Sequence, residues 1–166
     1  MEGSEVKDKF IPMYMTIAET VAGQSSARRL QVGAIIVKED RVISIGYNGM
    51  PAGWDNNCEN TLFVLDEDCQ GTDMVKLGYT KSRNGNWFKM VTKQEVIHAE
   101  ANAIAKLARC TESGDGSTMF LTHAPCIDCA KQIYTAGIKS VYYRNSYKDT
   151  LGIDFLEACQ VDVKQV

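Results

Sequence analysis

The chain has 166 residues, of which 45% are hydrophobic, and both values are typical of one globular domain. Its formal net charge of −3 disfavours a polynucleotide partner, because proteins that hold nucleic acid by its phosphates usually carry a basic face. A mononucleotide needs only one or two cationic side chains and stays compatible with this charge. No apolar run reaches 18 residues and the charged N-terminus lacks a signal core, so we expect a cytoplasmic protein with no membrane partner.

The first half of the chain predicts a helix followed by a β-hairpin. Residues 5–23 have apolar side chains at helical spacing, with Gly23 as the stop. Residues 31–38 and 42–47 are two short runs rich in β-formers, joined by a turn.

The segment from about 48 to 96 has weak periodicity and several turn signals. A loop of this length is uncommon unless it is functional or carries small elements of its own. We therefore expect a functional insertion at about 54–96, with short helices near 58–66 and a role in binding substrate or effector.

Regular alternation returns after this insertion. Helices are expected at 98–110, 126–136 and 150–159, and strands at 117–122, 138–143 and 160–164. Strands alternating with helices after an opening hairpin predict a single α/β domain over residues 1–166, with three α/β/α layers around one mixed sheet.

Two motifs at expected helix starts carry candidate metal ligands, His98-x-Glu100 and Pro-Cys126-x-x-Cys129. One His and two Cys provide three zinc ligands, and a catalytic zinc leaves its fourth position for water. Glu100 is then placed to carry a proton, as in the zinc-dependent nucleobase deaminases. A structural zinc completed by His123 and a redox dithiol are the alternatives, although a place at a strand end should direct His123 elsewhere.

The motifs "HAEANAI" and "APCIDCAK" resemble those of the zinc-dependent cytidine/deoxycytidylate deaminase superfamily. The stretch "QVGAIIV…ISIGYNGMPAG" is similar to the deoxycytidylate (dCMP) deaminases in particular, which convert dCMP to dUMP, the precursor of thymidylate. The resemblance implies a cytidine-deaminase-like fold with a five-stranded sheet, one catalytic Zn²⁺ held by His98, Cys126 and Cys129, and proton transfer by Glu100.

The same resemblance implies three substrate-binding residues. Arg29 matches a position near the phosphate, Asn48 one near the deoxyribose, and Tyr147 an aromatic that closes over the nucleotide. An Arg fork suits a phosphate, and an amide suits a sugar hydroxyl. A solvated pair formed by Arg28 and Arg29, and a surface role for Tyr147, stay open as alternatives.

The resemblance further implies a regulated hexamer, activated by dCTP and inhibited by dTTP, each bound with Mg²⁺. The effector site would include Gly46, Tyr47 and Gly49, since glycine lets backbone approach a triphosphate closely. The alternative for this segment is a tight turn after a strand.

The chain departs from some relatives in lacking a complete second zinc site. The insertion contains Cys58 and Cys69 but no His, so we expect small thiols there, and we expect Cys110 and Cys159 in the core. Two other functions remain open: a deaminase of free cytidine or tRNA adenosine, and a non-catalytic, zinc-containing nucleotide-binding regulator.

Overall fold

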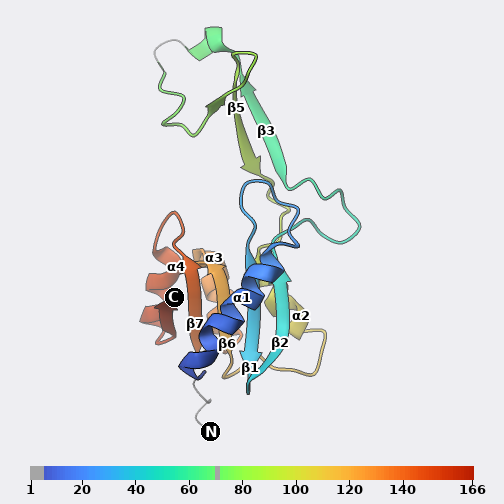
Figure 1. The fold of residues 1–166 in the computed structure, drawn as a ribbon, viewed down its shortest axis with the longest axis vertical. Coiled ribbons are helices and arrows are strands. Elements are labelled where there is room, and N and C mark those ends of the chain that lie inside the picture. Colours follow the sequence, from blue (N-terminus) through green and yellow to red (C-terminus); the bar gives the residue numbers. More distant parts are fainter. Residues whose placement is uncertain (1–5, 70–71) are drawn as a thin grey trace.

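A layered core and a long β-arm that projects from it make up the computed structural model, which describes residues 6–69 and 72–166 (Figure 1). The elements of the core are a 3₁₀ helix (Asp8–Phe10), α1 (Ile11–Ala22), β1 (Gly33–Lys38), β2 (Arg41–Tyr47), α2 (Ala99–Leu107), β6 (Thr118–His123), α3 (Ile127–Thr135), β7 (Ser140–Asn145), α4 (Leu151–Ala158) and β8 (Asp162–Gln165). The elements of the arm are β3 (Glu59–Val64), a 3₁₀ helix (Asp66–Cys69), β4 (Thr80–Lys81) and β5 (Trp87–Thr92).

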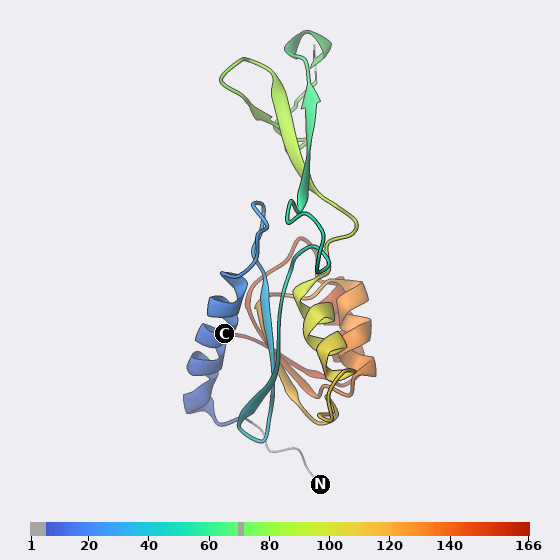
Figure 2. The same cartoon turned by 90° about the vertical axis from the view of Figure 1, so that its right-hand side faces the viewer.

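The core sheet has five strands in the order β2-β1-β6-β7-β8. The β1 strand is antiparallel to both β2 and β6, whereas β6, β7 and β8 run parallel, so the sheet is mixed. The α1 helix covers one face and α2 and α3 cover the other (Figure 2). The predicted three-layer α/β/α fold with a five-stranded mixed sheet is confirmed.

Alternation along β1 fills both halves of the core. Ile35 and Val37 pack with α1, while Ala34 and Ile36 pack with α2 and α3. All four side chains are at most 2% exposed. Successive strand residues point to opposite faces, and this run is apolar at every position because both faces are covered.

The first helix is shorter than predicted. It begins at Ile11 after the 3₁₀ helix, while its end at Gly23 is as expected; residue 5, where the predicted helix began, lies outside the described residues. Pro12 lies in the first turn, where its missing N–H removes no intrahelical bond. Within the described ranges, none of the helices has both the length and the apolar character needed to cross a membrane.

The insertion forms a strand where short helices were predicted near residues 58–66, and that prediction was wrong. The β3 strand pairs with β5 from Glu59↔Thr92 to Val64↔Trp87, and β4 pairs with the other edge of β5. The segment "ENTLFV" has no helical period, and its pairing partner "WFKMVT" lies more than 20 residues later. The arm leaves large apolar side chains in solvent, with Phe63 70% exposed.

Candidate active site

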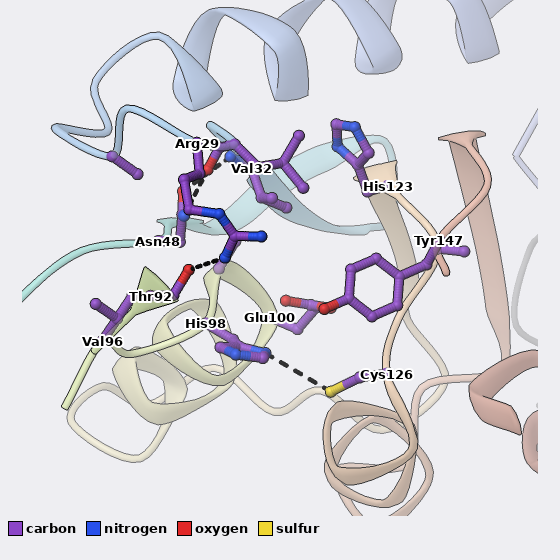
Figure 3. Close-up of a pocket in the computed structure, with 14 residues that line it drawn as sticks. Arg29, Val32, Asn48, Thr92, Val96, His98, Glu100, His123, Cys126 and Tyr147 are labelled. Carbon is purple, nitrogen blue, oxygen red and sulfur yellow. Dashed lines mark hydrogen bonds between the residues drawn. The ribbon is translucent and has the colours of Figure 1, made fainter. Parts of the chain in front are cut away.

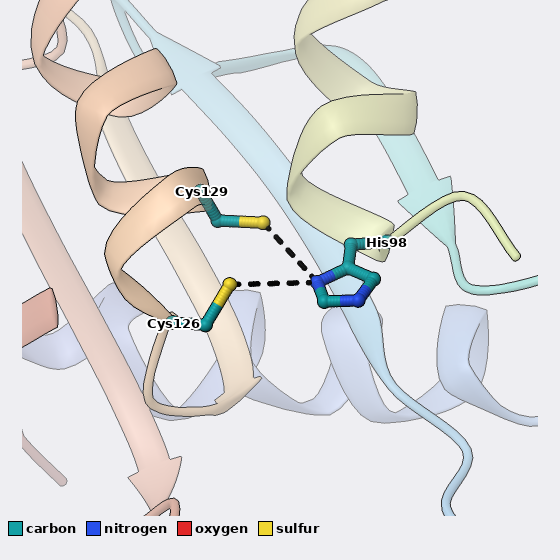
Figure 4. A group of neighbouring side chains, drawn as sticks. All are labelled: His98, Cys126 and Cys129. Atoms are coloured by element: carbon teal, nitrogen blue, oxygen red, sulfur yellow. Dashed lines mark hydrogen bonds between the residues drawn. The ribbon is translucent and has the colours of Figure 1, made fainter. Parts of the chain in front are cut away.

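The three predicted zinc ligands form one cluster at facing helix ends (Figure 4). The Sγ atoms of Cys126 and Cys129 lie 3.6 and 3.4 Å from His98 Nδ1, and all three donor atoms lie within 4.8 Å of one another. Zinc bonds of about 2.3 Å to sulfur and about 2.0 Å to nitrogen place tetrahedral ligands roughly 3.6 Å apart. The residues present therefore fit zinc, with Nδ1 as the histidine donor.

Two helix N-termini shape the electrostatics of this cluster. His98 is the N-cap residue of α2 and Cys126 that of α3, both in extended backbone conformations. The positive ends of both helix dipoles favour thiolate over thiol. The pKa of Cys126 is lowered to about 3, first by a hydrogen bond from Cys129 and next by His98. The pKa of Cys129 is raised by the same interaction and by burial.

Glu100 lies in the first turn of α2, beside the cluster but outside its set of donor atoms. Its side chain is only 4% exposed, and this burial raises the pKa of the carboxyl group. A carboxyl group whose pKa is raised by burial is suited to both accepting and returning a proton.

A cavity of about 300 Å³ opens over the cluster and Glu100 (Figure 3). It includes every predicted substrate-binding residue, namely Arg29, Asn48 and Tyr147. Tyr147 reaches into the cavity from the segment after β7, on the side of Cys126, whereas Arg29 enters from the opposite side (Figure 3).

The two arginines have different environments. The Nε of Arg28 lies 3.4 Å from the carboxylate of Glu59, and its Nη2 donates to Asn57. Arg29 instead donates from Nη1 to the Thr92 hydroxyl at 2.8 Å, and no acidic side chain in the described ranges pairs with it. The charge of Arg29 is therefore open to an anion in the cavity.

The Asn48 amide is largely engaged with the backbone. Its Oδ1 accepts from Val32 N–H and its Nδ2 donates to Leu30 carbonyl oxygen, both at 2.8 Å. One N–H and one lone pair remain for a ligand. Asn48 therefore also fixes the segment that follows Arg29.

A second cavity, of about 510 Å³, lies next to the predicted effector segment. Tyr47 and Gly49 line it together with Lys106 and Arg109, but Gly46 does not. A Cβ on Gly46 would lie 2.2 Å from Ala99 carbonyl oxygen, so this glycine allows β2 to approach α2 closely.

The remaining cysteines lie apart from the cluster formed by His98, Cys126 and Cys129. Cys58 is fully buried in a small apolar cluster with Ala27 and Val96, and Cys69 donates to Leu65 carbonyl oxygen. Cys159 packs against the main core. Cys110 was predicted to be buried, which is wrong: it follows the end of α2 and is exposed.

Several lining residues were not predicted from the sequence, notably Val32, Thr92, Val96 and His123. His123 is the last residue of β6 and lines the cavity, and it is not part of the His98/Cys126/Cys129 cluster. Burial lowers the pKa of its imidazole, which favours the neutral form. Thr92 lies 63 residues from Arg29, so no local motif could have indicated their contact.

A three-layer fold with a His/Cys/Cys cluster and an adjacent buried glutamate is typical of zinc-dependent nucleobase deaminases. Residues 9–145 match the family described as cytidine and deoxycytidylate deaminase zinc-binding region. The chain belongs to this family.

Individual relatives agree with this assignment. The chain is 36% identical over 151 residues to the deoxycytidylate deaminase of enterobacteria phage T4, covering 80% of this chain and 76% of that protein. It is 34% identical over 154 residues to ComE operon protein 2 of Bacillus subtilis, covering 92% and 69%. The dCMP deaminase of cyanophage S-TIM5, solved in complex with dCMP and dUMP, superposes with a TM-score of 0.77 at 37% identity, covering 98% of this chain and 100% of that one.

Proposed function

We propose that this chain catalyses the hydrolytic deamination of dCMP to dUMP, in the supply of thymidylate precursor. One observation carries the proposal: a single cavity contains the His98/Cys126 side of a zinc-compatible cluster, the buried Glu100, and Arg29, whose guanidinium pairs with no carboxylate in the part of the chain that the structure describes. The likeness to relatives that are dCMP deaminases supports the same substrate.

The chemistry divides between the metal ligands and Glu100. His98, Cys126 and Cys129 would hold Zn²⁺, which supplies a water of lowered pKa as the nucleophile. Glu100 takes up a proton from water at its carboxylate, holds it out of bulk solvent, and donates it to the ring nitrogen. It then takes up the second proton, from the oxygen that water has added to the ring, and donates that proton to the leaving amine. The raised pKa of Glu100 suits this exchange, because the group must bind and release a proton within one turnover.

Recognition of the nucleotide falls to the cavity wall. Arg29 binds the phosphate, since a guanidinium offers donors in the planar geometry that phosphate oxygens accept. Asn48 uses its remaining N–H for the deoxyribose. Tyr147 covers the nucleotide and limits the access of water.

The second cavity is the proposed effector site, with dCTP as activator and dTTP as inhibitor, each with Mg²⁺. Lys106 and Arg109 supply two cationic groups for a triphosphate. The two cavities share structure: Asn48 lines the first and its neighbours Tyr47 and Gly49 line the second. Asn102 Nδ2 also ties α2 to Tyr47 carbonyl oxygen at 2.9 Å, which gives effector binding a route to Glu100.

Further parts of the proposal concern organisation. We propose one deaminase domain over residues 1–166, carrying the insertion at about 54–96, in a cytoplasmic homohexamer. Sedimentation velocity with and without dCTP-Mg tests the assembly, and a monomer that responds to dCTP would contradict the hexamer.

Steady-state turnover tests the substrate directly. Zinc-loaded protein should convert dCMP to dUMP, faster with dCTP-Mg and more slowly with dTTP-Mg. Cytidine and a tRNA anticodon stem-loop, offered as competing substrates, distinguish the other deaminase reactions. Preferred turnover of either would refute dCMP as the substrate, and an absence of all turnover by protein with a full complement of zinc would favour a non-catalytic regulator.

A further inference from the structure

We infer that Glu59 and Thr92, at the base of the arm, are positioning residues that hold Arg29 for nucleotide binding. Glu59 holds the backbone of Arg29, and Thr92 holds its guanidinium. This inference rests on the proposed role of Arg29 at the phosphate. It assigns the arm a part in substrate recognition, although most of the arm projects away from the layered core (Figure 1).

Glu59 anchors the backbone that carries Arg29. Its Oε1 accepts hydrogen bonds from Arg28 N–H at 2.9 Å and Arg29 N–H at 3.1 Å. The Glu59 side chain is only 1% exposed, so these hydrogen bonds are shielded from water and hold the backbone of Arg28 and Arg29 firmly. A buried carboxylate needs such partners, because an unpaired charge there would be strongly destabilising.

Thr92 holds the side chain of the same arginine. Glu59 and Thr92 are directly paired residues of β3 and β5, so their side chains leave the same face of the arm. The Thr92 hydroxyl accepts from Arg29 Nη1 at 2.8 Å and also lines the catalytic cavity. One cross-strand pair therefore holds both ends of Arg29 (Figure 3 shows the Thr92 contact).

The charges are arranged so that Arg29 stays available. The Glu59 carboxylate interacts with the guanidinium of Arg28, which lies 3.4 Å away, and receives only the backbone N–H of Arg29. The guanidinium of Arg29 contacts a neutral hydroxyl, which orients it without cancelling its charge. A carboxylate at position 92 would compete with phosphate, whereas a hydroxyl does not.

The test compares T92V with T61V in zinc-loaded protein. Both substitutions remove a hydroxyl from the same face of the arm, because Thr61 is the next β3 residue on the side of Glu59. The Arg29 guanidinium, however, hydrogen-bonds Thr92, whereas Thr61 pairs with Met90. T92V should raise KM for dCMP about fivefold to tenfold, with kcat changed less than about twofold, since one hydrogen bond to a charged group is worth roughly a factor of ten. T61V should leave both constants unchanged.

A second variant and a double-mutant cycle separate positioning from general stability. E59Q keeps an acceptor for the two N–H groups but removes the charge, so KM should rise about threefold, in line with the weaker neutral bond. In an R29A background, neither T92V nor E59Q should raise KM further, because the residue through which they act is absent. A purely structural effect would persist in that background.

Calorimetric binding of dUMP and deoxyuridine completes the test. T92V should weaken dUMP binding and leave deoxyuridine binding unchanged, because only dUMP carries the phosphate. Equal KM values for T92V and wild type, or an undiminished T92V effect in R29A, would overturn the inference. Failure of the wild type to convert dCMP would refute the proposed function instead. The inference about Thr92 would then still be tested by whether T92V weakens the binding of dUMP but not of deoxyuridine.

Discussion

Gly46→Ala separates two explanations for a glycine in the segment "GYNG". The structure places Gly46 against α2, where an added Cβ would lie 2.2 Å from Ala99 carbonyl oxygen and 2.5 Å from Ala103 nitrogen. Both are backbone atoms, so no side-chain rotation can relieve the overlap. Increasing 2.2 Å to roughly 3.2 Å, the lower end of tolerated contacts, requires α2 and β2 to separate by about 1 Å.

Such a shift should affect both stability and catalysis, because α2 carries His98 as its N-cap residue and Glu100 in its first turn. Overpacking of this kind destabilises by about 1–3 kcal/mol, which lowers Tm by roughly 2–12 °C in a chain of this size. A displacement of about 1 Å at the reacting groups can reduce kcat about 100-fold. G46A should therefore show a lower Tm and lower turnover even without any effector.

Gly49→Ala is the matched control for stability. A Cβ there would meet only the ring of Tyr47, at 3.9 Å, which is an ordinary contact. Differential scanning fluorimetry and steady-state dCMP turnover should find G46A impaired, with the Tm of G49A close to that of wild type. The steric argument would be refuted by a G46A protein with wild-type Tm and basal turnover that has lost only its response to dCTP.

Three further changes test the chemistry, the ionisation and the coupling. E100Q should retain zinc, because Glu100 lies outside the ligand cluster, and its kcat should fall about 10²–10⁴-fold. Zinc analysis and steady-state turnover measure the two effects. A zinc-loaded E100Q protein with more than a hundredth of the wild-type turnover would exclude proton transfer by Glu100. Burial lowers the folded-state pKa of His123 below its unfolded value of about 6.5, so the unfolded chain binds the proton first. The stability of the wild type should therefore fall as the pH decreases through that value, and H123Q should lose this part of the dependence of Tm on pH. Parallel Tm–pH curves for the two proteins would contradict the role of His123. N102A removes the hydrogen bond between α2 and Tyr47 carbonyl oxygen. It should reduce the activation by dCTP, measured as the ratio of turnover with dCTP to turnover without it, more than it reduces basal turnover. An unchanged ratio would show that the coupling between the two cavities takes another route.

The accuracy of the sequence predictions depended on how local each signal was. The His98/Cys126/Cys129 cluster was predictable because Cys126 and Cys129 are one helical turn apart and His98 begins another helix, so spacing alone brings each motif to a helix N-terminus. The core strands were predictable because their apolar runs of four to eight residues, bounded by turn signals, are shorter than a typical buried helix. The β3 strand was not, since its structure depends on pairing with a partner distant in the sequence.

The same reasoning explains which parts of the site were missed. Thr92 and Glu59 contact Arg29 only through the register of the arm, and no sequence pattern gives that register. Gly46 was predicted to contact an effector because glycine permits close approach. Close approach is what the structure shows, but the approaching group is the backbone of α2.

The proposed catalytic groups and the proposed phosphate-binding arginine therefore lie on different parts of the chain. The cluster and Glu100 lie on α2 and α3, which belong to the main hydrophobic core, and their geometry is set by that core. Arg29 lies on a loop held at the base of an arm that leaves several large apolar side chains exposed. A three-stranded sheet with little apolar burial opens locally at lower free energy than a packed core. Changes within the arm should accordingly act on the affinity for the nucleotide, while changes in the core act on the chemical step.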